Sequence, residues 1–75
     1  MENRKTLRRL AANELLTADG RRLTPCVVEL SNGWVTAYYR LERELPQTEW
    51  IGGTIRLEKN CNGQLIAYHN EHLLT

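Results

Sequence analysis

The residue types that bind transition metals occur here as two histidines and two cysteines. His69 and His72 lie near the end of the chain, Cys61 shortly before them, and Cys26 far away in sequence. Structural zinc sites hold four such ligands in a tetrahedron, usually from closely spaced pairs of cysteines or histidines. The cysteines here stand alone, and on one strand positions 69 and 72 would point to opposite faces. We therefore expect unpaired thiols and surface histidines, with no metal site and no cofactor.

Nucleophilic and acid–base chemistry are the other reactions that these side chains offer. Cys26 lies beside two valines and is expected to pack as a small apolar residue, whereas Cys61 lies in a turn without an identifiable base. Glu42, Glu44 and Glu49 share one long connection, but glycosidase-type catalysis needs two carboxylates held across a cleft. A chain of 75 residues offers a shallow face instead of a deep cleft. The sequence therefore predicts a protein that is not an enzyme and has no catalytic residue.

Positive charge is concentrated at the beginning of the chain. Residues 1–22 contain six Lys or Arg and three Asp or Glu, whereas residues 23–75 contain four Lys or Arg and six Asp or Glu. A basic arm near aromatic side chains could hold single-stranded nucleic acid through phosphate contacts and stacking. The candidate contacts are Arg4, Lys5, Arg8 and Arg9. Nucleic-acid-binding domains are usually far more basic than a net charge of +1. A nucleic-acid-binding or regulatory protein that uses this arm is therefore the alternative, and residues 1–8 are interpreted as a flexible basic arm.

The aromatic residues indicate a protein interface. On a strand that starts at Trp34, side chains alternate, so Trp34 and Tyr38 would face one side and Tyr39 the other. One side must pack on the core, and the other must be covered by the long connection, by the N-terminal segment or by another chain. Trp and Tyr suit interfaces because they combine a large apolar area with a polar group. The candidate interface residues are Trp34, Tyr38, Tyr39 and Trp50, and the expected partner is a second copy of the chain.

The elements that position these residues are predicted to be strands joined by glycine turns. Three dipeptides supply the positive φ angles that tight hairpins need: Asp19-Gly20, Asn32-Gly33 and Asn62-Gly63. They predict one hairpin from 26–30 and 34–39 and another from 54–59 and 64–69, with Ile55 and Leu57 pointing inward. The two hairpins have similar sequences, which leaves internal duplication and convergence of turn chemistry both open.

Two further segments are less regular. Leu7, Leu10 and Leu15 fit a helical spacing, but the same segment also reads as a strand that turns at Asp19-Gly20, and we favour the strand. The connection 42–53 contains Pro46 and two successive glycines, which interrupt regular structure. We interpret it as an ordered crossover between the hairpins.

Part of the chain resembles a known family. The runs ELLTADG at 14–20, VVELSNGWV at 27–35 and ELP at 44–46 resemble the N-terminal "composite" β domain of metal-dependent amidohydrolases, and together they cover residues 14–46. The resemblance implies a small β module that lies beside a catalytic barrel in that family. This sequence lacks the His-x-His pair with which the family's metal site begins, and it is too short for the barrel. The resemblance therefore implies an accessory module without hydrolase activity; the chain also resembles short bacterial proteins, from which no activity follows.

Length and composition limit the fold. The chain is 41% hydrophobic and 25% charged, which indicates one thin-cored globular domain over residues 1–75. It has no apolar run that could cross a bilayer, no apolar segment after the first charged residues and no disulfide framework, so we expect a cytoplasmic protein. The prediction is an all-β fold of five or six antiparallel strands in a rolled sheet or small sandwich, with a short helix as the alternative for the first segment. Its predicted function is a non-catalytic binding or assembly module that forms a homodimer through a sheet face or edge.

Overall fold

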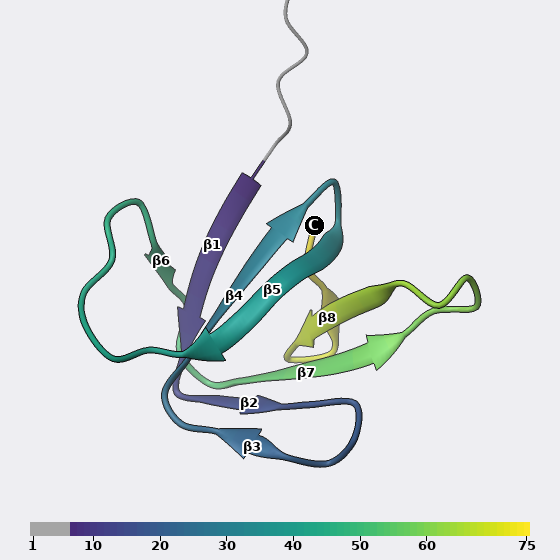
Figure 1. The fold of residues 1–75 in the computed structure, drawn as a ribbon, viewed down its shortest axis with the longest axis horizontal. Helices are drawn as coiled ribbons and strands as arrows, with labels where there is room; N and C mark the ends of the chain where they lie inside the picture. Colours follow the sequence, from purple (N-terminus) through teal and green to yellow (C-terminus); the bar gives the residue numbers. More distant parts are fainter. Residues whose placement is uncertain (1–6) are drawn as a thin grey trace, which may run out of the picture.

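The structure, a computed structural model, describes residues 7–75 and is all-β (Figure 1). Strands make up 57% of it and no helix occurs, which confirms the predicted fold class. Nine strands occur in this range: β1 (Leu7–Ala12), β2 (Glu14–Leu16), β3 (Arg22–Leu23), β4 (Cys26–Ser31), β5 (Trp34–Arg40), β6 (Glu49–Trp50), β7 (Thr54–Lys59), β8 (Leu65–His69) and β9 (His72–Leu73). Between residues 7 and 75 there is no helix long and apolar enough to span a membrane.

The strands form two mixed sheets, which corrects the expectation of five or six antiparallel strands. The four-stranded sheet has the order β5-β4-β1-β6, and the five-stranded sheet has the order β3-β2-β7-β8-β9. Two pairings are parallel, β1 with β6 and β2 with β7. The additional strands are two or three residues long, so they are too short to show the alternation of apolar and polar residues that predicts a strand.

Three chain segments pass from one sheet to the other at a common corner. β1 continues into β2 through Asn13, β3 into β4 through residues 24–25, and β6 into β7 through residues 51–53. These crossings converge in one place in Figure 1. Strands that switch sheets at a corner are characteristic of a sheet folded onto itself, and the fold is therefore a rolled sheet.

Hydrogen bonds continue through this corner, with a side chain in place of a main-chain acceptor at the bend itself. Ile51 N donates to Ala11 O over 2.8 Å before the bend, and Glu14 N donates to Gly53 O over 3.1 Å after it. Between them, the side-chain oxygen Oδ1 of Asn13 accepts a hydrogen bond of 2.7 Å from Gly53 N. The bend therefore leaves none of these polar groups without a partner.

Two successive glycines allow the third crossing segment, residues 51–53, to turn this sharply. Gly52 and Gly53 have φ angles of 68° and 67°, a region that side chains rarely adopt. A β-carbon on Gly53 would lie 3.2 Å from Nε2 of His69, and the same Nε2 lies 2.9 Å from the carbonyl oxygen of Gly52. The predicted break at these glycines is thus the corner of the fold.

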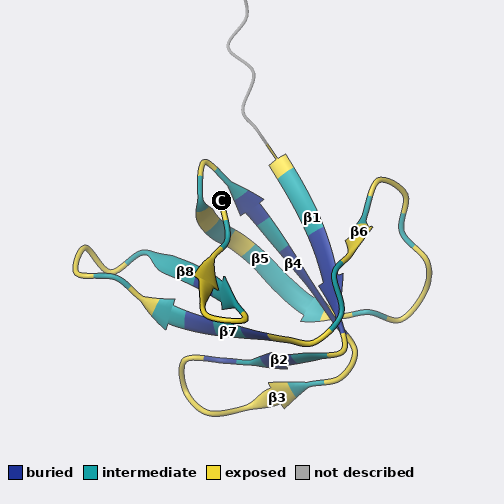
Figure 2. Cartoon of the chain, turned by 180° about the vertical axis from the view of Figure 1, so that it is seen from behind, coloured by how far each residue is buried: buried dark blue, intermediate teal, exposed yellow. Residues whose placement is uncertain are grey.

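The core lies between the two sheets, close to the corner. In Figure 2 the buried segments are found on β1, β2, β4 and β7, whereas the outer turns are exposed. Ile55 and Leu57 point inward as predicted, and Cys26 is a fully buried core residue. The core cluster consists of Leu10, Ala12, Leu15, Cys26, Val28, Leu30, Ile55, Leu57 and Ala67.

The N-terminal segment is a strand, so the helical alternative is wrong. The expected hairpin across Asp19-Gly20 forms between β2 and β3, but the residues before Asn13 belong to the other sheet as β1. Leu7 and Arg8, which were expected in a flexible arm, are part of β1, and residues 1–6 lie outside the described range. Since β1 and β2 are separated by one residue, no break in the apolar pattern marks the corner.

Both predicted hairpins form, but a bulge changes the faces of β5. Glu29 pairs with Ala37 and Leu30 pairs with Val35, so Thr36 is the extra residue. Val35 and Tyr38 consequently both pack against the core. The expectation that Trp34 and Tyr38 share a face is therefore wrong. The turns of the two hairpins also differ, with two residues at Asn32-Gly33 and a five-residue loop at 60–64, where a four-residue or bulged turn was expected.

We expect Gly53→Ala to destabilise the fold more than Gly63→Ala. An alanine at a positive φ angle costs about 1–2 kcal/mol, and both positions carry that cost because their φ angles are 67° and 82°. Only Gly53 adds crowding against His69, since nothing lies within 4 Å of an ideal β-carbon at Gly63. Urea unfolding of both variants measures the difference, and equal losses of unfolding free energy would contradict a crowded corner.

Candidate functional site

The candidate site lies on the outer face of the four-stranded sheet, which we define as the side turned away from the core. Strand pairing places its residues in three rows across β1, β4 and β5. The rows are Leu7–Ser31–Trp34, Arg9–Glu29–Ala37 and Ala11–Val27–Tyr39. Side chains in one row are direct neighbours because paired residues on adjacent strands point to the same side.

Exposure changes steeply along this face. Ala11 and Val27 are 2% and 0% exposed although neither belongs to the core cluster, whereas Leu7 and Trp34 at the other end are 57% and 45% exposed. The connection 41–48 lies against the buried row, since Ala11 lines a cleft together with residues of that connection. The face therefore has a covered end and an open end. The long connection, the N-terminal segment and another chain were the three candidates for covering this face. The connection covers the covered end.

A polar network in the middle row attaches the connection to the sheet. Arg9 Nε lies 3.3 Å from Glu29 Oε2, and Arg9 Nη1 donates to the carbonyl oxygen of Pro46 over 2.9 Å. The Tyr39 hydroxyl donates to the same carboxylate over 2.5 Å. This hydrogen bond, together with burial and the negative charge of Glu29, raises the pKa of Tyr39. Arg9 thus connects the sheet to the turn that closes over it.

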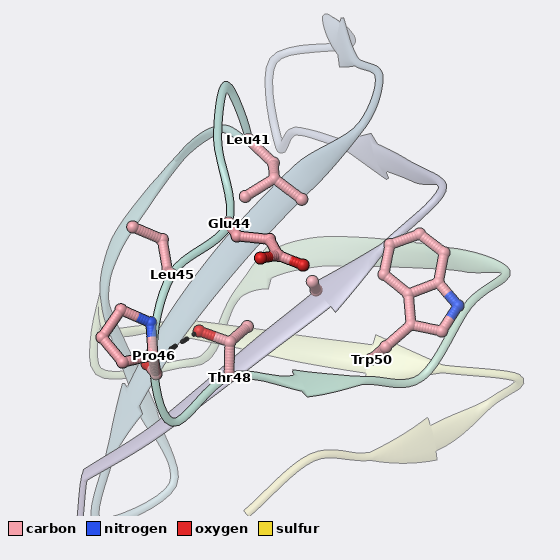
Figure 3. A pocket seen from close by; sticks show the side chains of 7 residues that line it. Leu41, Glu44, Leu45, Pro46, Thr48 and Trp50 are labelled. Atoms are coloured by element: carbon pink, nitrogen blue, oxygen red, sulfur yellow. Dashed lines mark hydrogen bonds between the residues drawn. The ribbon is translucent and has the colours of Figure 1, made fainter.

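The cleft at the covered end has a volume of about 620 Å³. Ala11 of β1 lines it. Leu41 and Leu45 lie on one side of it, and Trp50 lies on the opposite side (Figure 3). The carboxylate of Glu44 lies between these two sides, and Trp50 is 58% exposed. The remaining lining residues are Pro46 and Thr48, whose hydroxyl donates to the carbonyl oxygen of Pro46 over 3.2 Å. The cleft is therefore mainly apolar, with one acidic side chain.

The four predicted interface aromatics do not form a single patch. Trp34 lies at the open end of the outer face, Tyr39 is part of the polar network, and Tyr38 packs against the core. Trp50 borders the cleft on β6, which is the opposite edge of the sheet from β5. The structure thus separates them into a core residue, a network residue and two exposed indoles on different surfaces.

The predicted nucleic-acid contacts within the described range are occupied by intramolecular partners. Arg8 makes two hydrogen bonds to the Glu49 carboxylate, of 2.9 and 3.3 Å, and a third to the main-chain oxygen of Thr75. The hydrogen bond from Arg8 lowers the pKa of Glu49. Arg9 is held by the network described above, and Arg4 and Lys5 lie outside residues 7–75.

The histidines are arranged differently from the expectation. A two-residue turn at Asn70 and Glu71, both with positive φ angles, starts a further strand, so His69 and His72 face each other across β8 and β9. The expectation that they point to opposite faces of one strand is wrong, because the turn places them on two paired strands. The sequence does not indicate this turn, since it lacks the glycine that is typical of two-residue hairpin turns. Within residues 7–75 no three His, Cys, Asp or Glu side chains are grouped for a metal ion.

The two thiols lie in the environments that their neighbours predict. Cys26 is buried, its Sγ lies 3.7 Å from the carbonyl oxygen of Ala12, and burial raises the pKa of its thiol. Cys61 is exposed in the loop between β7 and β8. Neither thiol lines the cleft.

Sequence reasoning identified Glu44 and Trp50 but missed the cleft that brings them together. A usable signal was present, because the connection carries Leu41, Leu45, Pro46 and Trp50 among its charged residues. Apolar side chains at this density in a connection indicate that it packs against a sheet face.

We expect Tyr39→Phe to lower the free energy of unfolding by about 1 kcal/mol at neutral pH, because the variant loses the hydrogen bond to Glu29. Since the folded-state pKa of Tyr39 is raised, this stabilisation is complete below the unfolded-state pKa and is lost as pH rises through the folded-state value. Urea unfolding across the alkaline range should therefore show the two proteins converging.

The matched control is Tyr38→Phe, because the Tyr38 hydroxyl makes no hydrogen bond to any residue in the described range. A difference between wild type and Tyr39→Phe that stays constant through the alkaline range would contradict the network.

Comparisons of the chain with protein-family models, with curated proteins and with solved structures found no match. The resemblance to the amidohydrolase β domain stays a prediction.

Proposed function

We propose that this chain is a non-catalytic binding and assembly module that self-associates through the open end of its outer face. The observation that carries the proposal is the row Leu7–Ser31–Trp34, in which the two apolar side chains are 57% and 45% exposed. The exposed Leu7 and Trp34 side chains lie on either side of Ser31 and supply apolar area at the surface, and tryptophans are frequent anchors of interfaces.

A second copy is the partner that this patch suits. In a dimer with two-fold symmetry, Trp34 of each copy can lie on the partner's Leu7, so one row serves both sides of the contact. The neighbouring row carries the Arg9–Glu29 ion pair, which would supply a polar rim. β5 is also an edge strand, and such strands favour association with another chain. The covered end is not available for this contact, so the proposed interface is smaller than a complete sheet face.

The cleft supports a binding role more than a catalytic one. Glu44 is the only acidic, basic or thiol side chain among its seven lining residues, and no second such group stands opposite it. General acid–base catalysis on a substrate uses a positioned pair of groups in most hydrolytic enzymes.

The alternative of nucleic-acid binding receives no specific support from the described residues. Arg8 and Arg9 are both paired with carboxylates, which neutralises the charge that phosphate contacts would need. The reading as an accessory β module of an amidohydrolase is compatible with a non-catalytic role but adds no residue to the proposed interface.

We expect light scattering at micromolar concentration to give twice the chain mass of 8.7 kDa. Trp34→Glu should shift the protein to the monomer, because it replaces the largest apolar side chain of the proposed interface with a charge. Leu73→Glu is the matched control, since Leu73 is 49% exposed on β9 of the other sheet, and this variant should remain dimeric. A wild-type mass of 8.7 kDa, or dissociation by the Leu73 variant alone, would contradict the proposal.

A further inference from the structure

The cleft at the covered end has a charge that no residue of the described range 7–75 balances in an ion pair. Five other acidic side chains in the described range each form an ion pair with an arginine: Glu14, Asp19, Glu29, Glu49 and Glu58. Glu44, like Glu42 and Glu71, has no such partner among residues 7–75, and of these three only Glu44 lines the cleft, where its carboxylate lies between the walls (Figure 3). Two basic residues close to the connection in sequence or contact do not line the cleft. Arg43 lines a separate hollow with Tyr39 and Arg40, and Arg9 is held by Glu29 and Pro46 O.

The walls of the cleft suit a long aliphatic chain. Leu41, Leu45, Pro46 and Ala11 all line the cleft, so a methylene chain could lie on apolar surface along its length. An entirely apolar guest would remove water from the Glu44 carboxylate without replacing it, which is unfavourable. An anionic guest would be repelled by the negative charge of the same carboxylate.

Trp50 supplies the second contact that a positive charge prefers. Its ring is 58% exposed, and its Nε1 lies 3.7 Å from the position of a β-carbon on Gly52, so the pyrrole edge rests against the corner while the ring borders the cleft. Indole faces attract cations more strongly than other side chains do. A carboxylate and an indole on opposite sides of an apolar cleft therefore match a cation at the end of an aliphatic chain.

From this charge complementarity we infer that the cleft binds a lysine or arginine side chain of a partner polypeptide, with the cation between Glu44 and Trp50 and the methylene chain on Leu41 and Leu45. This binding site is separate from the row Leu7–Ser31–Trp34, which lies at the other end of the outer face. The inference is therefore independent of self-association.

The test uses Trp50 as its own reporter. The chain has two tryptophans, Trp34 and Trp50, so Trp34→Phe leaves one indole, which borders the cleft. Titration of this protein with N-acetyl-lysine methylamide at constant ionic strength should give a saturable change in Trp50 fluorescence. N-acetyl-norleucine methylamide has a similar chain length without the charge and should bind more weakly.

Glu44→Gln in this background should weaken lysine-amide binding about fivefold, which is the upper range for an exposed ion pair. Glu42→Gln is the matched control, because Glu42 lies two residues away and lines the separate hollow; its affinity should equal that of the parent. Equal affinities for the lysine and norleucine amides, equal losses in the two glutamine variants, or no saturable change would overturn the inference. Because Trp34 is already substituted, none of these results depends on whether the wild-type chain forms a dimer.

Discussion

The structure depends on the corner at which three chain segments change sheets together. A strand that bends sharply inside a protein loses free energy unless its main-chain polar groups find hydrogen-bond partners on both sides of the bend. Here the ladder between the first and the third crossing segments continues through the bend from Ile51 to Gly53, and the Asn13 side chain fills the place where the main chain cannot pair. Positive φ angles at Gly52 and Gly53 make the turn accessible, and His69 fits against the space that the missing side chains leave.

The corner also determines where the site can form. It holds β6 parallel to β1, with Trp50 beside Ala11, so the chain that leaves β5 must return to the far edge of the same sheet. The connection therefore passes over the outer face, and Arg9 attaches it there through the carbonyl oxygen of Pro46. A covered end with an acidic cleft and an open end with an apolar row follow from one topological requirement. The proposed self-association and the inferred cation site thus occupy different parts of a single face.

The sequence predicted those features of the fold that depend on local chemistry. Asn32-Gly33 and Asn62-Gly63 mark real turns because the need for positive φ is visible in the residue type, and Ile55 and Leu57 point inward as their alternation indicates. The corner at Asn13 and both parallel pairings were not predictable, since they depend on residues about 40 positions apart in sequence. The bulge at Thr36 and the turn at Asn70 and Glu71 carry no distinctive residue pattern. For the site, the sequence identified Trp34, Glu44 and Trp50 individually, but their surfaces are defined only by the topology.

Native-state amide hydrogen exchange of the full chain tests the central claim most directly, because it reports whether the corner is a permanent part of the folded structure. The amides of Ile51 and Gly53 donate to Ala11 O and to the Asn13 side chain. They should therefore exchange as slowly as the amide of Val28, which lies in the buried part of β4. Exchange of the Ile51 and Gly53 amides at the rate of the amides in the connection 41–48 would contradict the account.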